Sequence, residues 1–150
     1  RVVNPTVLVV ALVGTAVDAV TKAWARHSLA GHPAHVAGSV WLRLRYNSGV
    51  SFSFSPSGTL VTSVLTVVVA LAVVVVGLRA RPGAPAAGFG LLIGGGVANV
   101  IDRLAATPHR VTDFVALGSF PVFNLADAAI TAGFVVLVVA ALRGEALTRA

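Results

Sequence analysis

Long apolar runs separated by short polar segments dominate the pattern of the chain. No charged residue interrupts 2–17, 56–78, 82–101 or 128–142. A helix that crosses the hydrocarbon core of a bilayer needs about 20 mostly apolar residues. The pattern therefore predicts four membrane-spanning helices. We expect them over residues 5–25, 57–78, 84–103 and 122–142.

The first run also resembles the apolar core of a cleaved signal peptide. No small-residue cleavage site follows it cleanly, and it continues through Asp18 and Lys22 toward Trp24. We therefore expect a retained helix. The chain begins at Arg1 without a methionine, and we expect that residues precede it.

The segment between the first two runs changes to a period of two. Over 40–46, apolar residues occupy alternate positions and both arginines lie on the opposite face. The residues at 47–49, Asn-Ser-Gly, have the chemistry of a hairpin turn, and the alternation resumes over 50–55. We predict a small antiparallel sheet over about 38–56, lying on the membrane surface with its aromatic residues at headgroup depth. The alternative is an irregular loop with a chance alternation.

The composition supports a membrane protein. Of the 150 residues, 57% are hydrophobic and only 11% are charged. Soluble domains carry about 25% charged residues, so lipid must cover part of this surface. We expect an all-α integral membrane protein with one domain over 1–150. The absence of cysteine excludes disulfides, thiol nucleophiles and thiolate metal sites.

The net charge of +6 raises the question of nucleic-acid binding. The basic residues, however, occur singly or in pairs, whereas nucleic-acid-binding proteins usually cluster them on one face. Arginines that flank apolar runs are typical of membrane-interface anchors. We expect no nucleic-acid partner. The basic residues divide almost equally between the two sides of the four spans, so charge alone leaves the orientation open.

Four of the five acidic residues lie where an ionised group is costly. Glu145 belongs to the polar tail, but the others lie at or inside the ends of apolar runs or in the loop between the last two. An ionisable group near hydrocarbon depth is unfavourable unless it is paired or hydrated, and it is a functional candidate by default. The four candidates are Asp18, Asp102, Asp113 and Asp127.

Asp18 and Lys22 lie four residues apart and therefore share one helix face. A structural ion pair at the membrane interface is the favoured interpretation. The alternative is a Ser–Lys protease dyad that uses Lys22, but none of the nearby serines lies in a nucleophile elbow.

Asn99, Asp102 and Arg103 share a face near the end of the third run. Gly95 precedes Asn99 by four residues on that face and is flanked by two further glycines. Small residues allow close helix approach, so we expect this polar group to pack against a neighbouring helix. A structural interpretation, an Asp–Arg pair that closes the helix end, is compatible with a functional role.

Asn124 and Asp127 begin the fourth run in the manner of a capping box, with Asn124 as the N-cap. Capping alone would explain both residues. Asp113, however, also lies in an apolar stretch, where the nearby cation is Arg110, and no basic residue occurs over 113–127. A buried acid at that position needs a partner, and Asp127 is a suitable one.

Two carboxylates in a partly dry site do not ionise together easily. A charged one can deprotonate a water for attack on a peptide carbonyl, while a protonated one can donate to the leaving nitrogen. The helix N-terminus beneath Asp127 favours it as the base. Coupled carboxylates are nevertheless assigned as a pair.

The four histidines do not form a convincing metal site. Three of them fall within nine residues of a loop that contains glycine and proline. Zinc requires three or four convergent ligands on a fixed scaffold, so we expect no metal. The residues concerned are His27, His32, His35 and His109.

Five short motifs occur in the order found in the lipoprotein signal peptidases, also called signal peptidase II, which the chain closely resembles over nearly its whole length. They are Asp18-x-x-x-Lys22; Asn47-x-Gly49 followed by Phe52; Gly95-Gly96-x-x-Asn99-x-x-Asp102-Arg103; Val111-x-Asp113-Phe114; and Phe123-Asn124-x-Ala126-Asp127. Each motif alone is weak, but together they are specific. Ala98 departs from the usual glycine, and larger residues surround Phe52 than in the usual pattern.

The resemblance implies four transmembrane helices in the bacterial cytoplasmic (inner) membrane, both termini in the cytoplasm, and an extracytoplasmic β-sheet cradle near the active site. It implies an aspartic endopeptidase that removes the signal peptide from diacylglyceryl-modified prolipoproteins by hydrolysis just before the lipidated cysteine. It implies no metal or organic cofactor. The expected partners are the prolipoprotein substrate and membrane lipid, and we expect a monomer.

The resemblance also carries residue roles over to this chain. The catalytic dyad falls on Asp113 and Asp127. The matches to positions that place the dyad and the substrate are Asn99, Arg103 and Asn124. The matches to other motif positions, expected to support the substrate or the dyad, are Asp18, Lys22, Asn47, Gly49 and Asp102.

Two other classes of function also place acids in a membrane. A small transporter or channel subunit would use them as a proton relay, but it predicts acids at mid-depth and an internal repeat of the spans. Here the acids lie toward one interface, and no repeat is evident. A lipid-binding scaffold with structural ion pairs would survive the loss of either Asp113 or Asp127.

Overall fold

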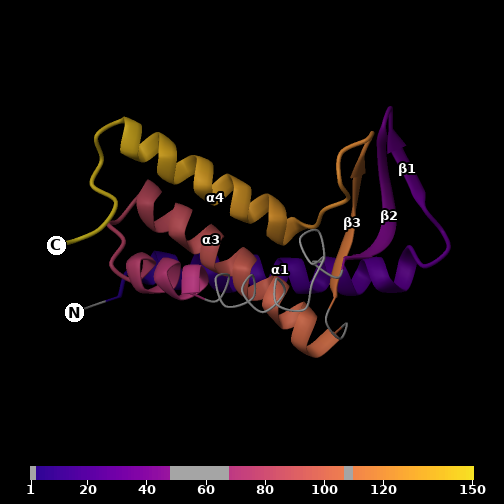
Figure 1. Cartoon of the computed structure of the whole chain (residues 1–150), viewed down its shortest axis with the longest axis horizontal. Helices are drawn as coiled ribbons and strands as arrows, with labels where there is room; N and C mark the ends of the chain where they lie inside the picture. The colour runs from indigo at the N-terminus through magenta and orange to yellow at the C-terminus, as the bar shows by residue number, and fades with distance from the viewer. Residues whose placement is uncertain (1–2, 48–67, 107–109) are drawn as a thin grey trace, which may run out of the picture.

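The computed structural model describes residues 3–47, 68–106 and 110–150. Within these ranges, long helices form a bundle and three strands form a sheet at one end of it (Figure 1). The elements are α1 (Pro5–Ser28), β1 (Ala34–Ala37), β2 (Val40–Asn47), α3 (Ala84–Ile101), the π-helix η2 (Asp102–Ala106), β3 (Val111–Leu117) and α4 (Leu125–Leu142). A shorter apolar helix covers Val68–Gly77.

Three of the described helices are long and apolar enough to cross a membrane: α1, the segment Ala84–Ala105 and α4. They expose large apolar side chains, such as Leu12 on α1 (71% exposed) and Phe134 on α4 (62% exposed). Such surfaces are unfavourable in water and favourable in lipid. The expected mainly helical membrane protein with a small sheet is thus confirmed. The fourth expected span, 57–78, lies largely outside the described residues.

α3 packs between α1 and α4 through glycines. A Cβ added at Gly94 would lie 2.7 Å from the carbonyl oxygen of Ala11 in α1, and one at Gly95 would lie 2.5 Å from that of Ala126 in α4. Thr15 Oγ1 also donates to the Gly94 carbonyl at 3.1 Å. Small residues therefore bring the three backbones into direct contact, as the position of Gly95 predicted.

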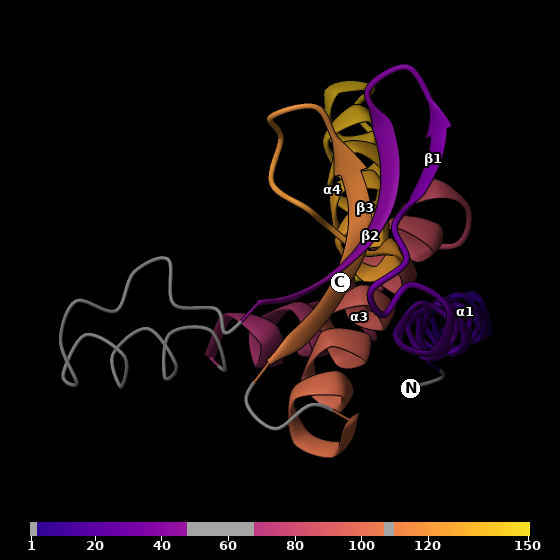
Figure 2. The same ribbon diagram turned by 90° about the vertical axis from the view of Figure 1, so that its right-hand side faces the viewer.

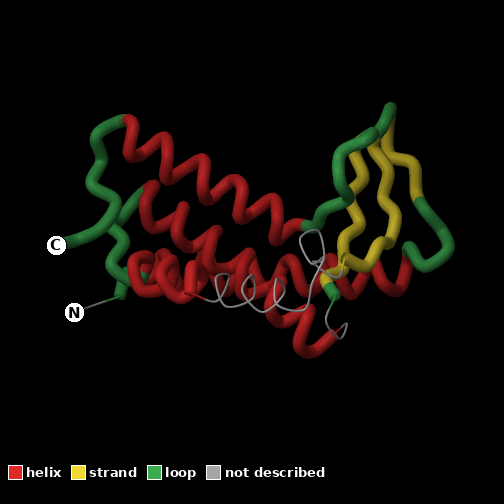
Figure 3. The backbone as a smooth tube through the Cα atoms, viewed as in Figure 1, coloured by secondary structure: helices red, strands yellow, loops and turns green. Residues whose placement is uncertain are grey.

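The sheet is antiparallel, in the order β1-β2-β3, and stands across the end of the bundle (Figures 2 and 3). β2 confirms the predicted strand at 40–46. Its partners were not predicted, because β1 is short and β3 is buried on both faces and so lacks the alternation of a half-exposed strand. The predicted second strand at 50–55, with Gly49 before it, lies outside the described residues.

The two ends of the bundle differ in character. Beneath the sheet, Ala25 and Leu29 of α1 pack against Phe114 of β3. At the other end, Asn4 donates to the carbonyl of Ala80, and the amide of Arg81 donates to the carbonyl of Leu147. Both chain ends therefore lie together, opposite the sheet (Figure 1). Asn4 is also the N-cap of α1.

Replacing Gly95 with alanine tests the close packing of α3 on α4. The added Cβ must displace a backbone carbonyl, and overpacking of this kind costs typically about 1–3 kcal/mol. We expect a lower unfolding temperature in detergent for Gly95→Ala. The matched control is Gly96→Ala, which adds the same atom where nothing lies within 4 Å. Equal losses in the two variants would contradict this packing.

Candidate functional site

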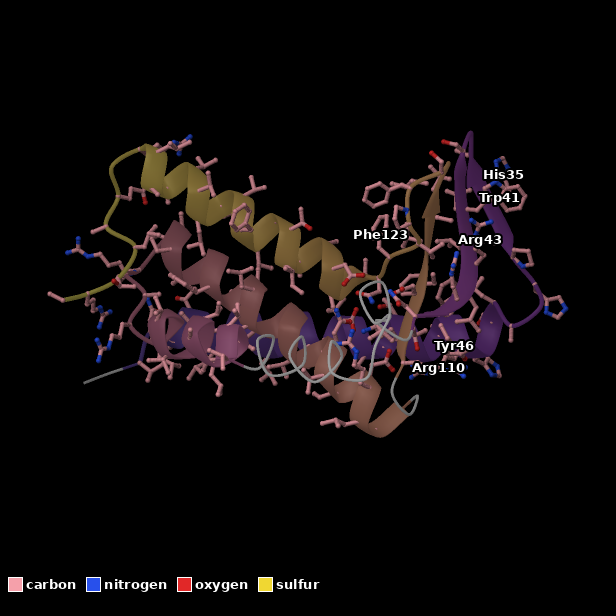
Figure 4. The ribbon with its side chains drawn as sticks, viewed as in Figure 1. His35, Trp41, Arg43, Tyr46, Arg110 and Phe123 are labelled. Atoms are coloured by element: carbon pink, nitrogen blue, oxygen red, sulfur yellow. The ribbon has the colours of Figure 1, made fainter. Side chains whose placement is uncertain are left out.

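Buried polar side chains gather where β3 meets α1, α3 and the start of α4. Figure 4 shows side-chain nitrogen and oxygen atoms concentrated at this junction. Among the described residues, the buried polar side chains are Asn4, Asp18, Lys22, Asp102, Thr112, Asp113 and Asn124. All of them except Asn4 belong to the junction. The structure thus brings together residues that are far apart in the sequence.

Asp113 lies on β3 and is almost completely buried, with 2% of its side chain exposed. Asn124 Nδ2 donates a hydrogen bond to Asp113 Oδ1 at 2.8 Å. Asn47, at the end of β2, makes a second side-chain hydrogen bond to this carboxyl group. The pairing of β2 with β3 places Asn47 opposite Val111, two residues from Asp113.

Asn124 and Asp127 form the predicted capping box at the start of α4. The Asp127 amide donates to Asn124 Oδ1 at 2.9 Å, and the Asn124 amide donates to Asp127 Oδ2 at 3.2 Å. This local arrangement satisfies two amides that a helix start leaves unpaired. It leaves the Asn124 amino group free of the cap, and that group reaches Asp113. One asparagine therefore contacts both candidate catalytic carboxyl groups.

Asn99 of α3 supports the other oxygen of Asp127. Its Nδ2 donates to Asp127 Oδ1 at 3.0 Å. Its Oδ1 accepts from Asn124 Nδ2 at 3.2 Å and from Lys22 Nζ at 2.8 Å. Asn99 thus links the start of α4 to α1.

Asp18 and Lys22 form the predicted ion pair, with 2.6 Å between Asp18 Oδ2 and Lys22 Nζ. Only 1% of each side chain is exposed. Asp18 Oδ1 accepts a hydrogen bond from the amide of Ala126 at 2.7 Å. The pair therefore does more than neutralise charge, because it also caps α4 from a neighbouring helix.

Asp102 connects three elements at the edge of the site. Its carboxylate lies 3.1 Å from Arg26 and 3.7 Å from Lys22, both on α1. It also accepts from the amide of Thr112 on β3 at 2.6 Å. The sequence interpretation paired Asp102 with Arg103 at its own helix end. In the structure Asp102 begins η2, and its ion pairs with Lys22 and Arg26 cross to α1.

Two further residues were predicted for the site, Arg103 and Gly49. Arg103 is partly exposed on η2, and Gly49 lies outside the described residues. Two participants were missed by sequence reasoning, Arg26 and Thr112. Arg26 follows Lys22 by four residues and so continues the polar face of α1, a signal that was available.

The sheet carries aromatic and basic side chains away from this junction. His35 stacks on Trp41 with 4.6 Å between ring centroids, and Figure 4 shows both at the outer side of the sheet. His35 Nε2 also bonds to the Gly38 carbonyl, and His32 Nδ1 to that of Ala30. Each of these two rings thus contacts a nearby backbone carbonyl.

Burial and charge set the protonation of Asp113. Its pKa is raised from 3.8 to about 6, chiefly by burial and next by the negative charge of the nearby Asp127 carboxylate. The hydrogen bonds from Asn124 and Asn47 and the charge of Lys22 oppose this rise. Asp127 is only half-buried, so the two carboxyl groups have different surroundings. Such a pair can hold one proton and one negative charge next to a water molecule.

Comparison with known proteins identifies relatives of this arrangement. A family model described as Signal peptidase (SPase) II matches residues 10–143. The chain is 38% identical to a lipoprotein signal peptidase of Rhodococcus jostii, over 91% of this chain and 72% of the relative. It is 35% identical to that of Mycolicibacterium smegmatis, over 91% and 61%. It is 33% identical to that of Mycobacterium tuberculosis, over 91% and 71%.

Two solved bacterial membrane enzymes share the fold. One superposes with a TM-score of 0.81 and 23% identity, covering 95% of this chain and 96% of the other. The second has a TM-score of 0.78 and 22% identity, covering 95% and 91%. At this level of identity the likeness shows the fold alone.

The raised pKa of Asp113 predicts a pH dependence of stability. Between 3.8 and about 6 the folded protein retains a proton that the unfolded chain has released, so stability falls as pH rises through this interval. Asp113→Asn removes the titrating group. We expect the unfolding temperature of this variant, relative to wild type, to increase across the interval in detergent. Parallel curves for the two proteins would contradict the assignment.

Proposed function

The chain belongs to the signal peptidase II family, the lipoprotein signal peptidases, and on this premise we propose that Asp113 and Asp127 are its catalytic dyad. Members of the family are aspartic peptidases that cleave signal peptides from prolipoproteins. Membership of this family therefore favours a peptidase over the two alternatives, a proton relay and a lipid-binding scaffold. The observation that best supports this assignment is that Asn124 donates hydrogen bonds to both carboxyl groups.

The two aspartates have complementary roles in this proposal. Asp113, whose pKa is about 6, holds the proton in its buried position on β3. Asp127 is half-buried and accepts hydrogen bonds from Asn99 and from the Asn124 amide. Asp127 deprotonates a water for attack on the peptide carbonyl, and Asp113 donates its proton to the leaving nitrogen. The chemistry needs no metal or organic cofactor.

Neutral amide donors contact the two carboxyl groups, and charged residues behind them hold these donors in place. Asn99 and Asn124 orient the carboxyl groups through the bonds described above. Arg103, partly exposed on η2, is proposed to contact the substrate, together with Gly49. The supporting residues are Asn47, Asp102, Asp18 and Lys22.

The bundle is proposed to have four spans, with the run 57–78 as the second. Asn47 ends β2 at the sheet end, whereas Ala80 lies with both chain ends at the opposite end. This separation of Asn47 from Ala80 supports the proposed further span, as does the apolar helix Val68–Gly77. We place the termini in the cytoplasm and the dyad near the extracytoplasmic face of the bacterial inner membrane.

The substrate class follows from this location. A cysteine that carries a diacylglyceryl group holds its peptide bond at the membrane boundary, which a soluble protease reaches poorly. The exposed apolar side chains of the spans would contact the lipid, and the sheet would form a cradle near the scissile bond. The proposed cleavage lies just before this cysteine, and the enzyme acts as a monomer.

A gel-shift assay with purified protein and a diacylglyceryl-modified prolipoprotein tests the dyad. Asp113→Asn and Asp127→Asn each remove one acid–base group with little change of shape. We expect each to lower the cleavage rate roughly 100- to 10,000-fold. Unfolding temperature and elution volume in detergent check that each variant is folded.

Glu145→Gln is the matched control, because it makes the same chemical change at an exposed acid in the tail. It should cleave as the wild type does. A folded Asp113→Asn or Asp127→Asn variant that cleaves at a comparable rate would exclude the dyad and return attention to a Ser–Lys mechanism.

A further inference from the structure

Lys22 is a buried cation that contacts a neutral amide in addition to the carboxylates that balance its charge. Its ammonium group bonds to Asp18 at 2.6 Å and lies 3.7 Å from Asp102, so two carboxylates surround it. It also donates to Asn99 Oδ1 at 2.8 Å. This third contact joins the ion pair to an amide that touches the proposed dyad.

The chemistry of an ammonium group determines which way the Asn99 amide faces. Lysine can only donate hydrogen bonds, so it requires the oxygen of Asn99 on its side. Asn124 Nδ2 donates to the same oxygen at 3.2 Å. A rotated Asn99 would place its NH₂ against two donors and lose both bonds. The rotation would also turn an oxygen toward Asp127.

We propose that Lys22 is a positioning residue, which acts on Asp127 by fixing the orientation of the Asn99 amide. Asn99 Nδ2 is then always presented to Asp127 Oδ1, at 3.0 Å in the structure. This inference rests on the proposed catalytic role of Asp127. It assigns Lys22 a specific task in the cleavage step that is separate from its pairing with Asp18.

Asp18 fixes the same part of the site through the backbone. Its Oδ2 pairs with Lys22, and its Oδ1 accepts from the amide of Ala126, the residue before Asp127. One face of α1 therefore sets both the backbone turn that carries Asp127 and the amide that contacts its carboxylate. A shift of Lys22 changes the aim of Asp127 toward the water without removing any group that touches the substrate.

Steady-state kinetics of Lys22→Met tests the proposal. The side chain is similar in volume, but it has no charge and no donor. We expect kcat for the diacylglyceryl-modified prolipoprotein to fall about 100-fold, as for a small misplacement of a reacting group. KM should change little, since the substrate loses no contact. A kcat close to that of the wild type, or a change confined to KM, would overturn the proposal.

A double-mutant cycle separates positioning from general damage. Asn99→Ala removes the amide through which Lys22 is proposed to act. We expect Lys22→Met to cause little further loss of kcat in that background, because the two residues act in sequence. Losses that multiply would overturn the proposal. The matched comparison is Arg26→Met, which removes another cation bonded to Asp102 and should combine independently with Asn99→Ala.

A second variant covers the case in which Lys22→Met leaves Asp18 unpaired and fails to fold. Asp18→Asn with Lys22→Met removes both charges and keeps an oxygen for the Ala126 amide. The expected fall in kcat and the cycle with Asn99→Ala are the same. Asp127→Asn, measured in parallel, keeps the two ideas distinct: activity in that variant refutes the dyad, whereas full activity without Lys22 refutes only its positioning role.

Discussion

The buried ion pair between Asp18 and Lys22 is the interaction on which the site depends. Neither charge tolerates the loss of its partner, because an uncompensated ion at this depth is strongly destabilising. Both ions also use their remaining hydrogen-bonding capacity on neighbours, Lys22 on Asn99 and Asp18 on the amide of Ala126. A sliding or rotation of α3 or α4 against α1 would leave a buried charge unsatisfied. The pair thus sets the relative depth of three helices at the point where the carboxyl groups must meet.

Close backbone contact of α3 with α1 and α4 allows the three helices to be fixed relative to one another in this way. Gly94 and Gly95 let α3 approach α1 and α4 so closely that a methyl group would not fit beside the carbonyls of Ala11 and Ala126. Ala126 takes part in both arrangements, since its carbonyl faces Gly95 and its amide binds Asp18. Packing and polar bonding therefore constrain the same turn of α4. Asn124 caps α4 and also reaches into the site, because its side-chain amino group is not used by the cap and donates to Asp113.

The sequence predicted the features that depend on local spacing. The Asp18–Lys22 pair, the capping box at Asn124 and Asp127, the close approach at Gly95 and the strand at β2 all follow from residues a few positions apart. The contacts across the chain were less accessible. Nothing local indicates that Asp102 would bind α1 and β3, or that β3, with both faces covered, would form the central link to Asp113. Those contacts are set by tertiary packing, which a single sequence does not display, although the family motifs identified most of the residues involved.

The distribution of charge around the dyad explains why the amides are needed. A cation in direct contact with Asp113 would favour its ionised form and remove the proton that the leaving nitrogen requires. Among the described residues, the neutral side chains of Asn47, Asn99 and Asn124 and the backbone amide of Asn124 donate hydrogen bonds to the two carboxyl groups. The cations Lys22 and Arg26 are instead bonded to Asp18 and Asp102, one step further from the dyad. The charge of Lys22 reaches Asp113 only weakly, as the last of the influences on its pKa. Neutral donors can therefore orient a carboxyl group without dictating its charge. The surrounding ion pairs hold those donors in place, and the dyad remains able to exchange a proton.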